Sequence, residues 1–285
     1  MSCCLAEIPP GALSAGVRAL KAQAMNQQIS TMTSPAPDMR DAKHALRKSI
    51  RSKVSAASSD ALVRQSRAGQ DLVLTMSEYM HAKRIGIYLS MPVGEASTDI
   101  LVRDALYCGK AVFVPYLHRP KGGADSGKGR RVMDMLRLQD VAEYAGLERD
   151  RWEIPSLSDE SVAGRENAMG GVGLEEKGEV ECELDLIVVP GVAFDAEGRR
   201  LGHGAGFYDE FIARYCEGGK RRKPYLGGSS PTFLHWYRAI DAQVVGLCLA
   251  EQFVGNEVEI PTTEWDWQVD AVAVGDGRFV TCGHA

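Results

Sequence analysis

An apolar segment, a segment with helical spacing and a second apolar segment follow one another in the first half of the chain, and this order limits the possible folds. RIGIYLS (84–90) predicts a buried strand, DILVRDALYCG (99–109) a helix and AVFVPYL (111–117) a second strand. Strand, helix and strand in succession are typical of a parallel pair. Further apolar strands are predicted at 181–194, 244–250 and 269–275. We therefore expect a three-layer α/β fold, with a mainly parallel sheet and helices on both faces.

The composition is that of an ordinary soluble globular protein and argues against several other classes. The chain has 285 residues, of which 45% are hydrophobic and 25% charged, so it can bury a sizeable core. A net charge of −5 argues against general affinity for nucleic acid or an anionic membrane, because both require a basic surface. The sequence contains no apolar run of about 18 residues, the length that a membrane-spanning helix requires.

Cysteine usage and the N-terminal segment bear on location. The seven cysteines form no C-x-x-C pair, and their odd number cannot give a closed disulfide set, which is typical of a reducing compartment. We expect a cytoplasmic monomer. A mitochondrial location is the alternative, because Glu7 and Asp38 are the only acidic residues of the first forty.

The chain divides by composition into an extension and one domain. Residues 1–40 are rich in Ala, Ser, Gln, Met and Pro, which favours a flexible tail. Residues 41–280 are expected to form a single α/β domain with two glycine-rich loop insertions, at 167–181 and 217–231. The second insertion contains KRRK (220–223), which is either a solvated basic run or a contact for a partner or import receptor.

The segment RRLGHGAGFYDEF (199–211) carries the strongest chemical signal in the sequence. Its three glycines stand at alternate positions between an apolar strand and a predicted helix. Glycines there would let backbone N–H groups approach phosphate oxygens, and the start of a helix favours negative charge. A flexible turn with a capping aspartate is the alternative interpretation. Cationic or proton-bearing side chains in this segment would favour phosphate binding: Arg199, Arg200 and His203.

Two further pairs of charged residues are candidates for a nucleotide site. Lys43 and Arg47 stand one turn apart on an amphipathic helix predicted from Asp41, where they present two cations together or form a solvated basic face. Asp209 and Asp266 are hard oxygen donors that could bind magnesium with a nucleotide, or else serve as a cap and a surface charge.

A second glycine-rich stretch imitates a phosphate-binding P-loop. GGADSGKGR (122–130) has the spacing of that motif, but Gly129 stands where the motif requires a serine or threonine hydroxyl for magnesium. Its flanks also resemble a hairpin and not a strand that leads into a helix. We therefore expect no P-loop here.

Six stretches, taken together in order and spacing, carry a family resemblance. They are KHALR (43–47), RIGIYLSMPVGEAST (84–98), MDMLRL (133–138), WEIP (152–155), DLIVVPGVAFDAEGRRLGHGAGFYD (185–209) and EIPTTEWDWQVDAV (259–272). Over about residues 43–274 the chain resembles 5-formyltetrahydrofolate cyclo-ligases, also called methenyltetrahydrofolate synthetases. Their order and spacing make the resemblance specific.

The resemblance implies a fold, a reaction and two small-molecule partners. The fold would be a single α/β domain of the NagB/RpiA/CoA-transferase-like type. The reaction would close 5-formyltetrahydrofolate to 5,10-methenyltetrahydrofolate with ATP as co-substrate and Mg²⁺ as cofactor, and would release ADP and phosphate. The formyl oxygen would take the γ-phosphoryl group before N10 of the folate attacks the activated carbon. The folate could carry a polyglutamate tail.

The resemblance also implies roles for individual residues. Nucleotide contacts would come from the first helix and the glycine-rich loop: Lys43, Arg47, Arg200, Leu201, Gly202, His203, Gly204, Ala205, Gly206, Phe207 and Tyr208. The folate would contact two further segments and the centre of the same loop: Tyr88, Leu89, Met91, Glu95, Trp152, His203, Gly204, Ala205, Gly206 and Phe207. Catalytic charge stabilisation would come from Arg47, Arg200 and His203, and the magnesium ligands would be Asp209 and Asp266.

The chain departs from the family pattern at three positions. Ala205 stands where many members have lysine or glycine, Phe207 replaces a frequent tyrosine, and Trp265 occupies a position where a smaller polar residue or histidine is usual. These changes motivate a rival hypothesis, a non-catalytic cyclo-ligase-like protein that binds folate or nucleotide. An NAD-dependent oxidoreductase is a third hypothesis, which depends only on the α/β pattern.

Overall fold

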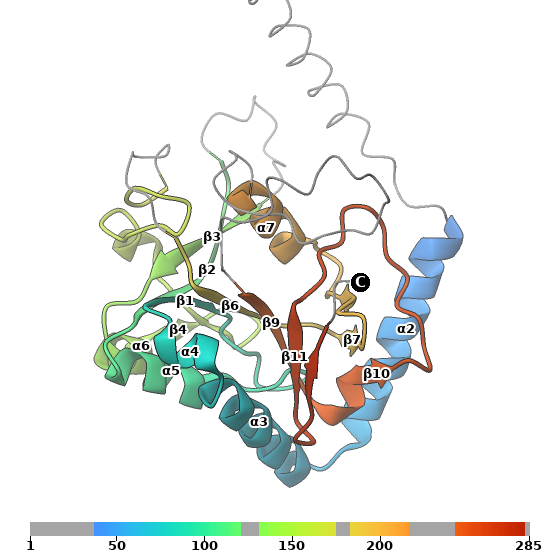
Figure 1. Cartoon of the computed structure of the whole chain (residues 1–285). Helices are drawn as coiled ribbons and strands as arrows, with labels where there is room; N and C mark the ends of the chain where they lie inside the picture. The colour runs from blue at the N-terminus through green and yellow to red at the C-terminus, as the bar shows by residue number, and fades with distance from the viewer. Residues whose placement is uncertain (1–36, 121–130, 175–182, 217–242, 283–285) are drawn as a thin grey trace, which may run out of the picture. The chain divides into compact units, whose positions relative to one another are not determined.

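The computed structural model describes residues 37–120, 131–174, 183–216 and 243–282 (Figure 1). The chain divides into two compact units, Met1–Arg40 and Asp41–Ala285. Several predicted features lie wholly or largely outside the described residues: the N-terminal extension, the P-loop-like stretch and the second insertion with its KRRK run; the first insertion is described over residues 167–174.

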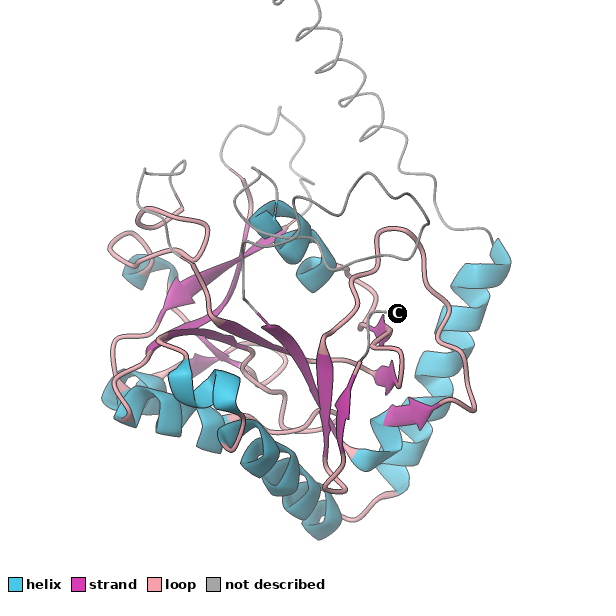
Figure 2. Ribbon diagram, viewed as in Figure 1, coloured by secondary structure: helices cyan, strands magenta, loops and turns pink. Residues whose placement is uncertain are grey.

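A seven-stranded sheet forms the centre of the second unit (Figure 2). In spatial order its strands are β12 (Phe279–Thr281), β11 (Ala271–Val274), β9 (Gln243–Cys248), β6 (Leu186–Val189), β1 (Arg84–Ile87), β2 (Ala111–His118) and β3 (Val132–Arg137). The five inner strands are parallel, and each edge strand is antiparallel to its neighbour. The expected mainly parallel sheet is thus confirmed, and the NagB/RpiA/CoA-transferase-like assignment stays a prediction.

Two small sheets accompany the central one. The first consists of β10 (Phe253–Gly255), β7 (Ala193–Asp195) and β8 (Arg200–Leu201), in that order. The second pairs β4 (Glu148–Arg149) with β5 (Pro155–Ser156). Because β8 leads directly into the glycine-rich loop, the first small sheet fixes where that loop begins.

The helices cover both faces of the central sheet, as expected. They are α2 (Pro37–Ala56), α3 (Ser59–Leu74), α4 (Ser77–His81), α5 (Asp99–Tyr107), α6 (Val141–Gly146) and α7 (Phe207–Cys216). In Figure 1, α3 and α5 lie on one side of the sheet and α7 on the other. Between residues 59 and 81 the chain forms two helices and not one, because Thr75 N–H closes α3 on the carbonyls of Asp71 and Leu72 and Met76 is extended.

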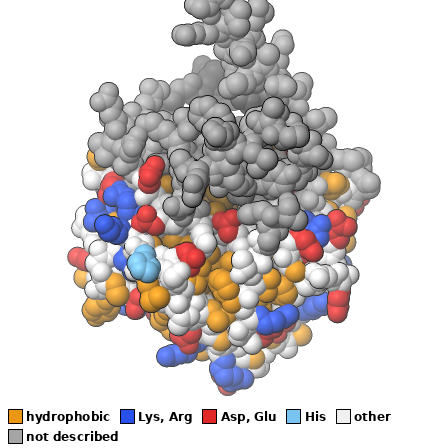
Figure 3. Space-filling model, viewed as in Figure 1, with side chains coloured by type: hydrophobic (Ala, Val, Ile, Leu, Met, Phe, Trp, Pro, Cys, Tyr) orange, Lys and Arg blue, Asp and Glu red, His pale blue; other side chains and the backbone are white. Residues whose placement is uncertain are grey.

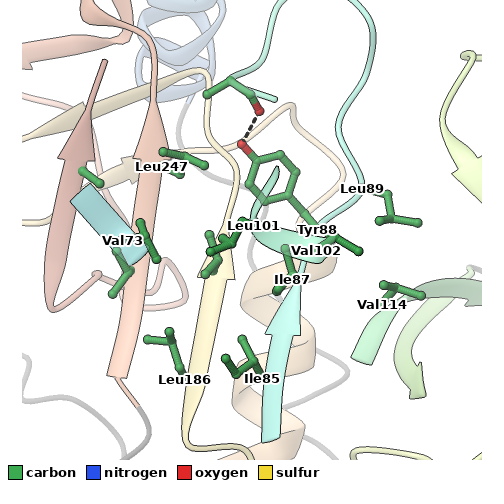
Figure 4. Close-up of a cluster of buried hydrophobic side chains, with 14 of the residues drawn as sticks. Val73, Ile85, Ile87, Tyr88, Leu89, Leu101, Val102, Val114, Leu186 and Leu247 are labelled. Atoms are coloured by element: carbon green, nitrogen blue, oxygen red, sulfur yellow. Dashed lines mark hydrogen bonds between the residues drawn. The ribbon is translucent and has the colours of Figure 1, made fainter. Parts of the chain in front are cut away.

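Side chains along each strand point alternately to the two faces of the sheet, so the core has two layers. Ile85 and Ile87 of β1 belong to the cluster that includes Val73 of α3 and Leu101 of α5 (Figure 4). On β6, by contrast, Ile187 joins Phe211 and other α7 side chains on the opposite face. Since successive side chains of a strand point to opposite faces, an uninterrupted apolar strand is what a sheet covered on both faces requires.

One glycine of the central sheet is predicted to tolerate no side chain. A Cβ added to Gly246 in β9 would come within 2.8 Å of Cδ1 of Phe194, which is fully buried. We expect Gly246→Ala to lower the free energy of unfolding in urea by about 1–3 kcal/mol, because overpacking forces neighbours to shift. Gly146→Ala is the control, since its Cβ meets nothing within 4 Å. Equal stability of both variants would contradict this packing.

The described surface mixes charges of both signs. Figure 3 shows Lys and Arg side chains interspersed with Asp and Glu on the face in view, around patches of apolar side chains. None of the helices in the described ranges is long and apolar enough to cross a membrane.

Candidate active site

A cavity of about 710 Å³ opens at the carboxyl ends of β1, β2 and β6. Ligands of open α/β sheets commonly bind at this edge. Twelve of the residues that the sequence nominated line it: Tyr88, Leu89, Met91, Glu95, Trp152, Arg200, His203, Ala205, Gly206, Phe207, Tyr208 and Asp209. The other seven lie outside its lining: Lys43, Arg47, Arg199, Leu201, Gly202, Gly204 and Asp266.

The glycine-rich loop owes its path to backbone angles that glycine tolerates. Gly204 has φ +112° and Gly206 φ +71°, both in the region that side chains disfavour. Ala205, between them, is not in that region, so it adds a methyl group without backbone strain. The loop then turns directly into α7, whose first acidic residues are Asp209 and Glu210.

Helix α2 brings Lys43 and Arg47 to the outer side of this loop. Lys43 Nζ lies 2.6 Å from Asp266 Oδ2, and Arg47 Nε donates to Gly202 O at 2.8 Å. Partial burial, with the charge of Arg51, lowers the pKa of Arg47, while Asp266 opposes the shift. Residues more than 150 positions apart therefore meet here, which the sequence alone could not establish.

Arg200 lies beneath the loop with its side chain almost fully buried. Its Nη2 donates to Asp209 Oδ1 at 2.7 Å and its Nη1 to Pro190 O at 3.2 Å. The guanidinium also lies 5.7 Å from the centre of the Tyr208 ring. Its Nε is buried and has no acceptor among the described residues. A buried cation with a spare donor at the cavity wall is suited to an anionic group of a ligand.

The neighbouring Arg199 does not share this role, which corrects the expectation that all three basic residues of the segment serve the phosphates. Its guanidinium donates to Asp195 and Glu259, each at 2.7 Å, and to Glu197 at 3.1 Å. Arg199 does not line the cavity. Three carboxylates thus neutralise it on the other side of the strand.

Glu95 faces the loop from the segment that follows β1. Its Oε1 lies 2.9 Å from His203 Nε2, and its Oε2 accepts a hydrogen bond from Met91 N at 3.1 Å. Burial, with the charge of Glu95, raises the pKa values of Tyr88 and Tyr208, so both phenols stay neutral. Tyr88 donates its hydroxyl to Ala96 O at 2.6 Å, the dashed line of Figure 4.

The two candidate magnesium ligands are linked through the backbone of the residue that follows Asp266. Asp209 Oδ1 accepts from Trp267 N at 3.1 Å, and Trp267 directly follows Asp266 in the chain. Asp266 Oδ2 also accepts from Thr263 N and Oγ1. No group of three or more His, Cys, Asp and Glu residues within the described part of the chain could hold a metal. Two carboxylates nevertheless fit magnesium, which usually takes one or two plus phosphate oxygens.

Sequence reasoning missed the outer half of the cavity. This wall comes from the end of β2, the start of β3 and the segment 150–159: Tyr116, His118, Arg119, Arg131, Asp150 and Asp159. Only Trp152 was nominated there, and the guanidinium of Arg151 lies 3.8 Å from its ring centre. The carboxyl end of the predicted strand 111–117 was the available signal, since such ends line ligand sites.

A buried carboxylate behind this wall gives the protein an acid-sensitive contact. Burial would raise the pKa of Asp134, but contacts with His118 at 3.2 Å and Asn167 at 3.1 Å and the charge of Arg214 at 3.0 Å lower it to about 2. A lowered folded-state pKa stabilises the fold above the unfolded value near 3.8. That contribution is lost as the pH falls toward 2.

We expect this contact to contribute ~2 kcal/mol to the free energy of unfolding at neutral pH. Urea unfolding of the wild type and of Asp134→Asn at pH 6, 4 and 2 measures it. The difference between the two proteins should be largest at pH 6 and should shrink between pH 4 and 2. A difference that stays constant across this range would show that Asp134 has no lowered pKa.

Comparison with known proteins identifies relatives over most of the chain. The model of the 5-formyltetrahydrofolate cyclo-ligase family matches residues 39–275. The 5-formyltetrahydrofolate cyclo-ligase of Mus musculus is 31% identical over 82% of this chain and 94% of its own length. The probable 5-formyltetrahydrofolate cyclo-ligase of Caenorhabditis elegans is 29% identical over 82% and 93%.

A solved structure supports the fold independently. The NMR structure of Aquifex aeolicus 5,10-methenyltetrahydrofolate synthetase matches with a TM-score of 0.52 and 20% identity, over 85% of this chain and 94% of the other. The shared architecture is the mixed α/β fold with its large, mainly parallel sheet. With the family model covering residues 39–275, this chain belongs to the 5-formyltetrahydrofolate cyclo-ligase family.

Proposed function

We propose that the protein catalyses the ATP- and Mg²⁺-dependent cyclisation of 5-formyltetrahydrofolate to 5,10-methenyltetrahydrofolate. The observation that carries this proposal is the 2.9 Å contact between Glu95 and His203. It joins the wall nominated for folate to the loop nominated for nucleotide at the edge of one cavity. A substrate whose formyl group must meet the γ-phosphate requires that arrangement.

The nucleotide would lie along the glycine-rich loop on the side of α2. Lys43 and Arg47 supply cations from the helix, and loop N–H groups at the start of α7 can bind phosphate oxygens. Arg200 reaches the cavity from below with an unused Nε. The folate would occupy the cavity itself, with Glu95 accepting hydrogen bonds from the pterin and Trp152 at the outer wall.

The proposed chemistry has two steps. The formyl oxygen attacks the γ-phosphorus and ADP leaves, which gives a phosphorylated formyl group. N10 then attacks the formyl carbon and loses its proton, while the carbon–oxygen bond breaks and phosphate departs with the former formyl oxygen. Arg200 and His203 would stabilise negative charge on the transferring group. The protein's main contribution would be alignment and charge stabilisation.

Magnesium would be held by Asp209 and Asp266 together with phosphate oxygens, and would offset the charge of the triphosphate. One oxygen of each carboxylate, Oδ2 of Asp209 and Oδ1 of Asp266, accepts no hydrogen bond from the described residues. Asp266 also contacts Lys43 through its other oxygen, Oδ2. The proposed metal ligand and the proposed phosphate-binding cation would therefore lie side by side when the nucleotide binds.

Purified protein with 5-formyltetrahydrofolate, ATP and Mg²⁺ should develop the absorbance of the methenyl product. Folded protein that binds both ligands by calorimetry but forms no product would support the non-catalytic alternative that Ala205 and Phe207 motivate. Folded protein that binds neither would reject both proposals. Location in the cytoplasm and a monomeric state remain predictions for fractionation and ultracentrifugation.

A further inference from the structure

A buried glutamine between β9 and β10 makes three hydrogen bonds to the backbone near the cavity. Gln252 ends a short 3-10 helix, Ala250–Gln252, and is 2% exposed. Its Nε2 donates to Gly94 O at 3.1 Å and to Gly191 O at 2.9 Å, and its Oε1 accepts from Leu249 N at 3.0 Å. Both amide N–H groups are therefore used on backbone carbonyls.

The two carbonyls belong to two separate segments whose adjacent residues, Glu95 and Pro190, line the cavity. Gly94 directly precedes Glu95, the group that faces His203. Gly191 directly follows Pro190, whose carbonyl accepts from Arg200 Nη1. One side-chain amide thus fixes the distance between the backbone beside Glu95 and the backbone beside Arg200.

The two anchored segments differ in how firmly the rest of the fold holds them. Next to Gly191, Val192 N donates to Leu201 O at 2.7 Å and Val192 is buried. Before Gly94, Pro92 and Val93 are exposed, and Gly94 itself has φ +92° with open space where a Cβ would lie. Gln252 therefore transmits the rigidity of the β6–β7 turn to the tip of the loop that carries Glu95.

We propose that Gln252 is a positioning residue for the folate side of the site, which it serves by fixing the Glu95 loop against the Arg200 wall. This inference depends on the proposed function. It predicts a larger effect on folate binding than on nucleotide binding, because Val192 N also holds the Gly191 segment beside Arg200, and the cations of α2 bond to Asp266 and Gly202 and not to Gln252.

The chain offers a matched control in Gln65 of α3. Its Nε2 donates to Glu251 Oε1 at 3.1 Å and its Oε1 accepts from Ala250 N at 2.8 Å. Gln65 therefore supports the same 3-10 turn as Gln252, but its side-chain amide bonds to Glu251 and Ala250 and not to Gly94 or Gly191. If Gln252 only stabilised the turn, replacement of either glutamine would change folate binding equally.

The experiment compares Gln252→Met and Gln65→Met with the wild type by calorimetry. We expect Gln252→Met to raise the Kd for 5-formyltetrahydrofolate about tenfold, the effect of losing a net hydrogen bond, and to leave the Kd for ATP within about twofold. Gln65→Met should leave both constants unchanged. An unchanged folate Kd in Gln252→Met, or the same rise in Gln65→Met, would overturn the proposal. If Gln252→Met does not fold, Gln252→Asn, whose amide is one methylene too short for both carbonyls, takes its place.

Hydrogen exchange without ligands separates this inference from the proposed function. Backbone amides of residues 93–96 should exchange faster in Gln252→Met than in the wild type and stay unchanged in Gln65→Met. If the wild type bound no folate, the proposed function would fail and this comparison alone would decide the positioning role. Equal exchange in all three proteins would reject that role.

Discussion

Replacement of Asp209 by asparagine is expected to lower kcat/KM by about 100- to 1000-fold. The carboxylate lies 2.7 Å from buried Arg200 and lines the cavity, and in the proposed mechanism it would bind the nucleotide's magnesium. Asparagine keeps the shape and one acceptor but removes the charge, so the loss should fall on catalysis. Initial rates of methenyltetrahydrofolate formation, with a melting curve for each protein, measure it.

Alanine at the same position should have a second effect. It would remove the acceptor as well as the charge beside the buried guanidinium of Arg200, and loss of one partner of a buried ion pair typically costs about 3 kcal/mol or more. Asp209→Ala should therefore be inactive and also less stable in urea than Asp209→Asn. The control is Asp276→Asn, because Asp276 forms its ion pair with Arg278 in the β11–β12 turn and neither residue lines the cavity. Near-wild-type rates for Asp209→Asn would remove it from the proposed mechanism.

The second large effect is expected at Lys43. We expect Lys43→Met to raise the Kd for ATP about 10- to 100-fold, because a charge-assisted contact to a phosphate is lost. Binding of 5-formyltetrahydrofolate should be unchanged, since Lys43 does not line the cavity. Calorimetry with each ligand separately measures both constants.

Lys48 provides the control on the same helix. It is exposed and lies five positions from Lys43, so Lys48→Met removes an equal charge without altering the contact to Asp266. Its Kd for ATP should match the wild type. If both variants raised the Kd for ATP equally, the effect would come from the overall charge of α2 and not from the position of Lys43.

Much of the fold could be predicted because its local signals agree with its packing. The centre of RIGIYLS and the segment LIVV (186–189) are continuously apolar, as parallel strands covered on both faces must be. The antiparallel edge strand β12 gave no comparable signal, because Phe279, Val280 and Thr281 are exposed or half-buried. Its place depends on pairing with β11.

The site was harder to predict where the direction of a side chain decides whether it lines the cavity. Arg199 and Arg200 are adjacent and chemically identical, yet only Arg200 reaches the cavity. Neighbouring residues of an extended strand point to opposite sides, and which side faces the ligand depends on the tertiary arrangement. Gln252 was missed for another reason, because its partners are backbone carbonyls, which leave no mark in the residue types of the sequence.

Isotope transfer from the substrate tests the central claim most directly. If the formyl oxygen takes the γ-phosphoryl group, 5-formyltetrahydrofolate labelled with ¹⁸O in the formyl group must yield phosphate that carries one ¹⁸O for each methenyltetrahydrofolate formed. Mass spectrometry of the phosphate, read beside the product absorbance, gives this ratio. Labelled phosphate in equal amount to the product is the expected result. Unlabelled phosphate, or no product from folded protein, would contradict the account.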